Sequence, residues 1–319
     1  MRALVYDGTG AILTDRPDPR PERGEALLAI RLAGVCRTDL EILDGYMNFR
    51  GVMGHEFVGT VLAGPPGWSG KRVTAEINCP CGQCRLCLMG LGGHCPTRTV
   101  LGIVGRDGVF AELVAVPVAN LHEIPDSVSD DQAVFIEPLA AALQIFHQVA
   151  VSDKDNVVVL GDGRLAQLIA RVLMAKCGRA VMVGRYARRL VVAARAGAET
   201  FLAADFTPAA QADVVIDATG TPEGFELAMQ AVRPRGTIVL KSTFAGGRPL
   251  NLAPLVINEV TVVGSRCGPF DEAIALLASG QIEVASLITA RVPLGRAMEA
   301  LLAAKNRENL KVVIEVGEP

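Results

Sequence analysis

Short apolar runs alternate with helical patterns through the second half of the chain. The runs are rich in β-branched residues and predict strands at 157–160, 180–183, 200–202, 214–216, 237–240 and 260–263. Between the first two runs, residues 163–177 carry apolar positions at helical spacing, which predicts an amphipathic helix. Strands that alternate with helices form a parallel sheet covered by helices. The pattern therefore predicts a doubly wound α/β domain.

Composition narrows the class of protein. The chain has 319 residues, enough for roughly two domains. Lys plus Arg is 31 and Asp plus Glu is 34, and this net charge of −3 argues against a nucleic-acid partner bound through a basic face. No apolar run approaches the ~20 residues of a membrane span, and the N-terminus has no apolar export segment. We expect a cytoplasmic protein with no membrane partner.

Five of the eight cysteines lie within residues 79–95. Without an export signal, such a cluster indicates a metal site rather than a disulfide framework. Cys81, Cys84, Cys87 and Cys95 have the spacing C-x2-C-x2-C-x7-C. Four thiolates complete a tetrahedral zinc site with no open position. The sequence therefore predicts a structural zinc in this segment.

A glycine-rich turn follows the first predicted strand of the second half. Residues 161–166 match G-x-G-x-x-A and open the predicted helix. Gly161 would make the tight turn, and Gly163 would let the backbone approach a pyrophosphate at the helix N-terminus. We expect these two glycines, with Arg164 and Leu165 in the first helical turn, to bind a dinucleotide.

The end of the second strand bears on which dinucleotide is used. A carboxylate there would accept the ribose hydroxyls of NAD and repel the 2′-phosphate of NADP. This chain has Gly184 instead, followed by Arg185, Arg188 and Arg189. We expect Gly184 to leave room for a phosphate and Arg185 to pair with it, whereas Arg189 would start a solvated helix. The sequence predicts a preference for NADP, with NAD as the alternative.

Residues of the kind that zinc accepts also occur in three other segments of the chain. They are Cys36 in 34–45, His55 and Glu56 in 54–59, and Glu137 in 135–142. A catalytic zinc takes three protein ligands and keeps one position for water or substrate. Spacing alone does not bring these segments together, and a histidine beside a glutamate is also compatible with a structural pair.

In this order, the motifs resemble those of the zinc-dependent medium-chain alcohol and polyol dehydrogenases, a family that includes sorbitol, threonine and glucose dehydrogenases. The motifs are Cys-x-Thr-Asp at 36–39, Gly-His-Glu at 54–56, the four cysteines, Glu-Pro-Leu-Ala at 137–140, the glycine-rich turn and Asp-Ala-Thr-Gly at 217–220. The resemblance covers essentially the whole chain. It implies a GroES-like, β-rich catalytic domain of residues 1–122, completed by 264–319, and a Rossmann domain of residues 123–263.

The resemblance also implies the ligands of a catalytic zinc. Cys36, His55 and Glu137 would hold the metal, with Glu56 as an alternating or outer ligand. Asp39 would orient His55 or the ligand shell. With the cysteine cluster, this gives two zinc ions per chain.

Further roles follow from the same resemblance. Thr38 corresponds to the hydroxyl that contacts the substrate alcohol and starts the proton relay. Many relatives have a relay histidine three residues later, where this chain has Glu41. That carboxylate could carry a proton or bind sugar hydroxyls, as in NADP-using glucose dehydrogenases, or it could be a surface residue. Thr219 and Lys311 correspond to positions near the cofactor.

The leading hypothesis is a zinc- and NADP-dependent dehydrogenase of a polyol, sugar or secondary alcohol. The alternatives are an NAD-dependent polyol or threonine dehydrogenase, a zinc-free quinone or enoyl reductase, and a non-catalytic paralogue that keeps one zinc. The metal-ligand set argues against the reductase. Residues 259–266 would end the parallel sheet, and an exposed terminal strand invites pairing with a second copy. We therefore expect a homodimer or homotetramer.

Overall fold

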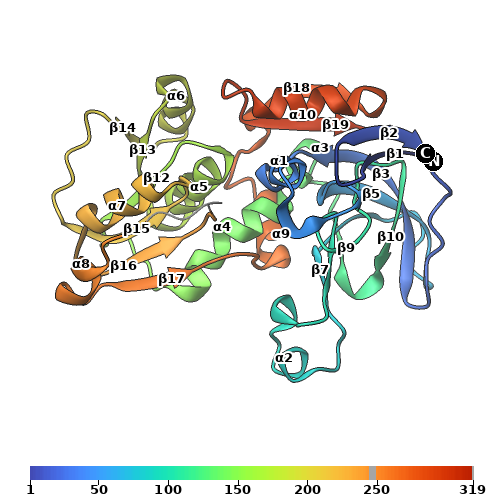
Figure 1. The fold of residues 1–319 in the computed structure, drawn as a ribbon, viewed down its shortest axis with the longest axis horizontal. Coiled ribbons are helices and arrows are strands. Elements are labelled where there is room, and N and C mark those ends of the chain that lie inside the picture. The colour runs from blue at the N-terminus through green and yellow to red at the C-terminus, as the bar shows by residue number, and fades with distance from the viewer. Residues whose placement is uncertain (244–248, 318–319) are drawn as a thin grey trace. The chain divides into compact units, whose positions relative to one another are not determined.

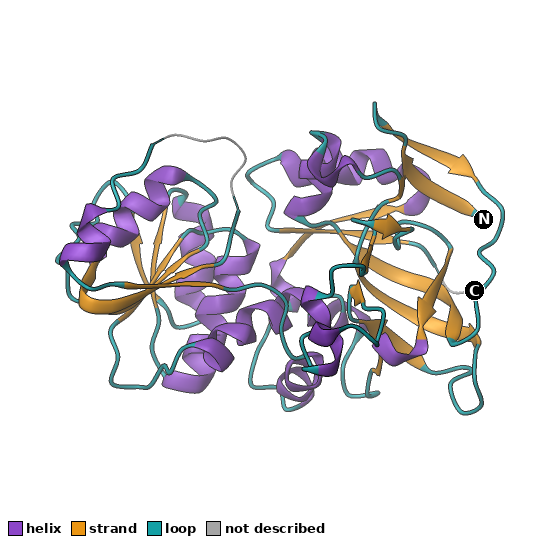
Figure 2. Cartoon of the chain, turned by 60° about the horizontal axis from the view of Figure 1, so that its bottom comes forward, coloured by secondary structure: helices purple, strands orange, loops and turns teal. Residues whose placement is uncertain are grey.

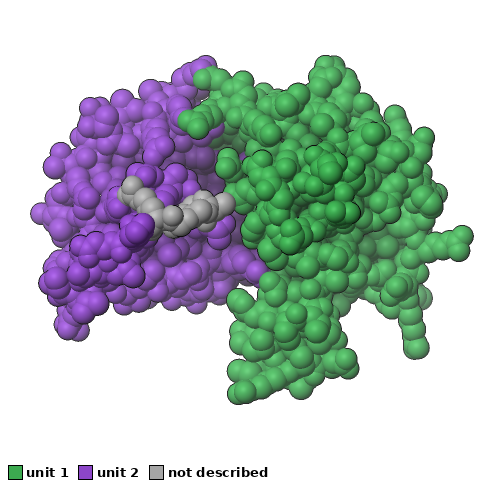
Figure 3. All heavy atoms as spheres, viewed as in Figure 1, with its two compact units in different colours: residues 1–137, 273–319 green, residues 138–272 purple. Residues whose placement is uncertain are grey.

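The computed structural model describes residues 1–243 and 249–317, and the chain forms two compact units (Figures 1 and 3). Unit 1 comprises Met1–Glu137 and Ala273–Pro319, and unit 2 comprises Pro138–Glu272. Both boundaries fall later in the chain than the predicted ones, inside helices α4 (Ile136–Gln148) and α9 (Phe270–Ala278). Residues 244–248 and 318–319 of the predicted domains lie outside the described residues.

A seven-stranded sheet forms the centre of unit 1. Its order is β11-β6-β5-β3-β19-β18, with β10 also paired to β3. The strands are β3 (Glu25–Gly34), β5 (Glu56–Ala63), β6 (Arg72–Ala75), β10 (Leu113–Pro117), β11 (Leu121–Glu123), β18 (Ile288–Pro293) and β19 (Lys311–Glu315). The antiparallel pairing of β19 with β3 sets Val313 opposite Gly34. The last strand of the chain thus completes the sheet that the N-terminal strands begin.

Smaller elements of unit 1 surround this sheet. One three-stranded sheet consists of β1 (Arg2–Tyr6), β2 (Ala11–Asp15) and β4 (Gly51–Val52). A second consists of β7 (Asn78–Cys79), β8 (Thr99–Leu101) and β9 (Gly105–Arg106). The helices are α1 (Arg37–Leu43), α2 (Arg85–Leu88), α3 (Asp130–Ala133) and α10 (Ala297–Lys305), together with most of α9. The 3₁₀ turns are η1 (Tyr46–Asn48), η2 (Gly92–His94), η3 (Val118–Asn120), η4 (Ala285–Leu287) and η5 (Leu294–Arg296).

Unit 2 contains a six-stranded parallel sheet with helices on both faces (Figure 2). The strands, in the order of the sheet, are β14 (Glu199–Leu202), β13 (Val181–Gly184), β12 (Val157–Leu160), β15 (Ala212–Asp217), β16 (Val232–Leu240) and β17 (Thr261–Gly264). The helices are α5 (Arg164–Cys177), α6 (Ala187–Arg195), α7 (Pro222–Ala231) and α8 (Ala253–Ile257), together with most of α4. The predicted doubly wound fold is confirmed, and all six predicted strands are present.

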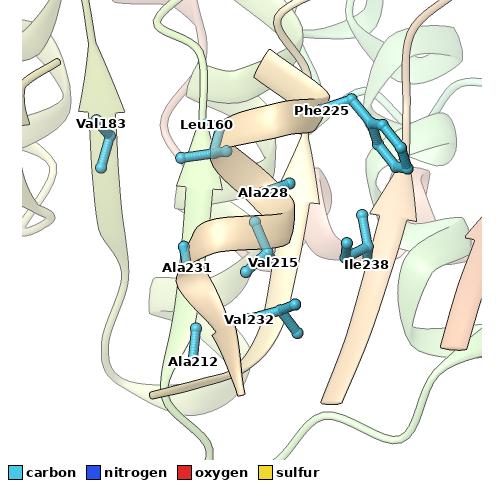
Figure 4. Packing of buried hydrophobic residues seen from close by; sticks show 9 residues of the cluster. All are labelled: Leu160, Val183, Ala212, Val215, Phe225, Ala228, Ala231, Val232 and Ile238. Carbon is cyan, nitrogen blue, oxygen red and sulfur yellow. The ribbon is translucent and has the colours of Figure 1, made fainter. Parts of the chain in front are cut away.

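Apolar side chains from α7 and the central strands form one cluster in unit 2 (Figure 4). Phe225 and Ala228 of α7 pack with Val215 of β15 and Ile238 of β16, and Leu160 of β12 belongs to the same cluster. Each large side chain buried in this way contributes about 1.5–3 kcal/mol. This packing fixes the carboxyl ends of β12 and β15, where doubly wound sheets bind their ligands.

Within residues 1–243 and 249–317, no helix is long and apolar enough to cross a membrane.

Candidate metal centres and cofactor site

The four cysteines predicted to bind zinc converge in unit 1. Their sulfur atoms all lie within 4.8 Å of one another. The separations are 3.4 Å for Cys84–Cys87, 3.6 Å for Cys81–Cys95 and 3.9 Å for Cys81–Cys87. Ligands 2.3 Å from a tetrahedral zinc ion lie about 3.8 Å apart, so these residues fit the metal.

The thiols of this cluster differ in acidity. Hydrogen bonds from the backbone N–H of Cys81 and from Thr97 lower the pKa of Cys95 to about 6. Loss of solvent and the hydrogen bond with Cys84 raise the pKa of Cys87 to about 11. Four thiolates this close together repel one another, and a divalent cation would offset that repulsion. The chemistry of the cluster therefore also fits a bound zinc.

A second group of candidate ligands in unit 1 consists of Cys36, His55 and Glu56. One potential ligand atom from each lies within 4.8 Å of the others. Cys36 caps the N-terminus of α1, His55 directly precedes β5, and Glu56 is the first residue of that strand. His55 and Glu56 are 3% and 1% exposed. Thiolate, imidazole and carboxylate together form a donor set that zinc accepts.

Asp39 supports both Cys36 and His55. Its Oδ2 accepts a hydrogen bond of 2.7 Å from the backbone N–H of Cys36, and its Oδ1 lies 3.4 Å from Nδ1 of His55. Burial disfavours protonation of His55, but the charges of Asp39 and Cys36 and their hydrogen bonds to the ring together outweigh it, so the pKa of His55 is raised well above its ordinary value. A carboxylate beside a ring nitrogen is the arrangement that orients metal-binding histidines.

Lys311, which the resemblance places near the cofactor, is buried inside unit 1. Its ammonium forms an ion pair with Glu56. Strand β19 carries Lys311 beneath Gly34, where an added Cβ would lie 2.5 Å from Nζ. The Phe135 ring covers the ammonium at 5.4 Å, and burial lowers the pKa of Lys311 to about 8.

The remaining predicted catalytic residues occupy α1 and the start of α4. Thr38 lies in the first turn of α1, with Oγ1 3.8 Å from the sulfur of Cys36. Glu41 lies one turn later and is paired with Arg37 at 3.4 Å. Glu137 is the second residue of α4, and among the described residues it is not in the group of ligand atoms formed by Cys36, His55 and Glu56.

The predicted dinucleotide turn lies between β12 and α5. Gly161 has a φ of +117°, and an added Cβ would lie 2.9 Å from the carbonyl oxygen of Ala218. Gly163 caps α5 and has open space around it, and Arg164 and Leu165 begin the helix. Thr219 follows β15 and donates its backbone N–H and its hydroxyl to Oδ1 of Asp217. These residues share the carboxyl edge of the parallel sheet.

The space beside Gly184 is occupied by Asp162, which corrects the expectation that a phosphate would fit there. An added Cβ at Gly184 would lie 2.6 Å from Cβ of Asp162. Arg189 is not a solvated residue either, because it pairs with Asp162 at 3.2 Å and its side chain is 16% exposed. The side chain of Arg185 is exposed, as expected for a ligand-binding residue. The sequence interpretation missed Asp162, although an acid inside G-x-G-x-x-A was the available signal.

Comparison with known proteins identifies two matching family models. The model described as "Alcohol dehydrogenase GroES-like domain" matches residues 22–126. The model described as "Zinc-binding dehydrogenase" matches residues 163–279.

Curated relatives match nearly the full chain. The chain is 30% identical to the starvation-sensing protein RspB of Escherichia coli K12 over 309 residues, which cover 91% of each protein. It is 30% identical to the L-galactonate-5-dehydrogenase of the same strain over 322 residues, 94% of each. The L-threonine 3-dehydrogenase of Streptomyces coelicolor is also 30% identical, over 319 residues that cover 91% of this chain and 92% of the relative.

Two solved structures have the same fold. The alcohol dehydrogenase rspB of Escherichia coli CFT073, complexed with NADH, has a TM-score of 0.91 at 26% identity and 99% coverage of both chains. A Sinorhizobium meliloti 1021 protein, solved bound to NADP, has a TM-score of 0.91 at 25% identity and the same coverage.

Proposed function

The chain belongs to the zinc-dependent medium-chain alcohol and polyol dehydrogenases, and from this membership we propose that it transfers a hydride between a polyol, sugar or secondary alcohol and NADP(H). Membership makes it a zinc-containing, NAD(P)-dependent oxidoreductase. The observation that carries the proposal is the group Cys36, His55 and Glu56 with Asp39 behind it. A paralogue without activity would have no need of this second, buried donor set.

Two zinc ions per chain have different tasks in this proposal. The four cysteines would hold a structural ion, since they leave no open position. Cys36, His55 and Glu137 would hold the catalytic ion, with Glu56 as the alternating or outer ligand. When bound there, zinc lowers the pKa of an alcohol and polarises a carbonyl.

The residues of α1 would support proton transfer. Thr38 Oγ1, next to Cys36, would accept the proton of the substrate hydroxyl, and Glu41 lies one turn further along the same helix. Asp39 would keep the imidazole of His55 in a single orientation through Nδ1. Glu41 is partly buried and paired with Arg37, so its role as a proton carrier would require that pair to open.

The glycine-rich turn would hold the cofactor in unit 2. Gly161 and Gly163 allow a close backbone approach at the N-terminus of α5, beside Thr219. Support for NADP comes from the exposed Arg185 and Arg188 after β13. Support for the alternative, NAD, comes from Asp162, which follows β12 and whose carboxylate reaches the end of β13, since a carboxylate there could accept ribose hydroxyls.

We further propose a cytoplasmic homodimer or homotetramer. None of the eight cysteines, all of which lie in the described part of the chain, forms a disulfide, and a cluster of zinc-binding thiolates suits a reducing compartment. Strand β17 lies at the end of the order of the parallel sheet and has exposed residues. Such an edge can pair with the same strand of a second copy.

The test is a substrate panel of sugars, polyols and secondary alcohols, each assayed with NADP⁺ and with NAD⁺ on zinc-loaded protein. Turnover with NADP⁺ on a sugar or polyol is the expected result. A clear preference for NAD⁺ would contradict the cofactor part and leave the zinc part intact. No turnover, with only one zinc bound, would favour the non-catalytic paralogue.

A further inference from the structure

Asp162 joins two loops at the carboxyl edge of the parallel sheet. It is the second residue of the glycine-rich turn, and its side chain reaches the loop between β13 and α6. Oδ2 accepts hydrogen bonds from the backbone N–H groups of Arg185 at 2.6 Å and Tyr186 at 2.8 Å. The residue is only 6% exposed. The turn expected to hold the pyrophosphate is thus bonded directly to the loop that begins with Arg185.

Gly184 lies directly against the side chain of Asp162. A Cβ at this position would lie 2.6 Å from Cβ and 2.7 Å from Oδ2 of Asp162. Real Cβ atoms do not approach other atoms this closely, so the acid at 162 requires a glycine at 184. The carboxylate therefore occupies the volume in which a side chain at the end of β13 would lie.

The negative charge of Asp162 is balanced by its surroundings. Besides the two N–H groups, Nη1 of Arg189 donates to Oδ1 at 3.2 Å. Arg189 is held in turn by its contact with the Tyr186 ring at 5.2 Å, and its carbonyl accepts a hydrogen bond of 2.8 Å from Gln167. A carboxylate with these partners repels a nearby phosphate much less than a solvated, unpaired one would.

We propose that Asp162 is a positioning residue for cofactor selection, which fixes the backbone of Arg185 and Tyr186 so that the Arg185 guanidinium can bind the 2′-phosphate of NADP. The proposal rests on the NADP preference proposed above. Asp162 acts through the loop and not by touching the phosphate. Loss of the Asp162 side chain would therefore weaken the binding of ligands that carry a 2′-phosphate and change the binding of ligands without that group much less.

The test uses the full chain and two probes that need no turnover. Adenosine 2′,5′-bisphosphate carries the 2′-phosphate, and 5′-AMP lacks it. Isothermal titration would compare wild type with Asp162→Ala and with Asp162→Asn, whose carbonyl oxygen can still accept the two N–H bonds. Asp205→Ala removes an exposed acid of the same unit and serves as the matched control. Hydrogen exchange of the Arg185 and Tyr186 amides gives a second readout.

For Asp162→Ala we expect the Kd of adenosine 2′,5′-bisphosphate to rise about tenfold, because two N–H groups lose their acceptor. The Kd of 5′-AMP should change less than about threefold, and both amides should exchange faster. Asp162→Asn should fall between wild type and the alanine variant. Asp205→Ala should match wild type in both readouts.

Two other results would overturn the proposal, and they differ from each other. If wild type favours the bisphosphate and Asp162→Ala keeps that preference, the positioning role is wrong and the NADP assignment stands. If wild type binds 5′-AMP more tightly than adenosine 2′,5′-bisphosphate, and Asp162→Ala weakens the binding of 5′-AMP, the carboxylate accepts ribose hydroxyls. In that case the NADP assignment fails together with the positioning role.

Discussion

Oδ1 of Asp39 lies 3.4 Å from Nδ1 of His55, and the two side chains are 0% and 3% exposed. Removing such a carboxylate typically costs 10–100-fold in metal affinity or activity, so we expect a loss of about this size from Asp39→Asn. Zinc content under chelator competition and kcat measure it. Asp44→Asn, in an exposed residue at the end of the same helix, is the control. Equal zinc retention and equal kcat in both variants would show that Asp39 does not support the metal.

The buried pair Lys311–Glu56 predicts a large effect on stability. Lys311→Met leaves a buried carboxylate without its partner, which costs about 3–5 kcal/mol in the free energy of unfolding. The double variant with Glu56→Gln should recover most of that loss, because the charge is removed as well. Urea unfolding measures both.

Lys71 provides the comparison for this experiment. It pairs with Glu123 at the surface, where the side chains are 37% and 54% exposed. Exposed pairs contribute about 0–1 kcal/mol, so Lys71→Met should change the unfolding free energy little. Equal effects of the two lysine substitutions would contradict the buried ion pair.

Much of unit 2 could be predicted from the sequence, because strands buried on both faces appear as short apolar runs. Strand β16 begins earlier than predicted, at Val232, which pairs with Ala212 of β15. The pairing is then interrupted by an irregularity over residues 233–236, where the apolar pattern also breaks, and resumes at Thr237 opposite Val214. Contacts between residues that are far apart in the sequence could not be predicted from such patterns. Glu56 and Lys311 are 255 positions apart, and the registers of β5 and of β19 against β3 bring them together.

In the candidate site, too, local spacing could be predicted from the sequence, but contacts between separate segments could not. The spacing of the four cysteines predicted their convergence, because short loops leave them few arrangements. Gly184 was interpreted from its own neighbourhood as space for a phosphate, whereas Asp162 fills that space from 22 positions away. The direction of one side chain decides this, and sequence spacing does not contain it.

The close contact at Gly184 can be tested by substitution. Gly184→Ala would set a methyl group against Asp162 and lower the free energy of unfolding by about 1–3 kcal/mol. Adding Asp162→Gly should recover part of this loss, since the contacted side chain is then gone. Gly264→Ala is the control, because nothing lies within 4 Å of its added Cβ. If both alanines had the same effect on urea unfolding, the contact would be refuted.

A substitution in the four-cysteine cluster should remove the structural zinc ion and leave the catalytic zinc site intact. Cys84→Ser should lower the zinc content from two ions to one per chain, because a hydroxyl is a poor replacement for a thiolate. Cys177→Ala removes a buried thiol from unit 2, outside both ligand groups, and should keep two ions. Elemental analysis of the purified variants gives the counts. A full zinc content in Cys84→Ser would rule out the proposed structural site.

Zinc content and turnover of Cys36→Ser, measured on the same preparation, show whether Cys36 holds a catalytic zinc ion. We expect this variant to keep the structural ion, lose the second one and reduce cofactor at a small fraction of the wild-type rate. If Cys36→Ser kept both zinc ions and full turnover, Cys36 would not be a ligand of a catalytic metal, and the proposed mechanism would be wrong.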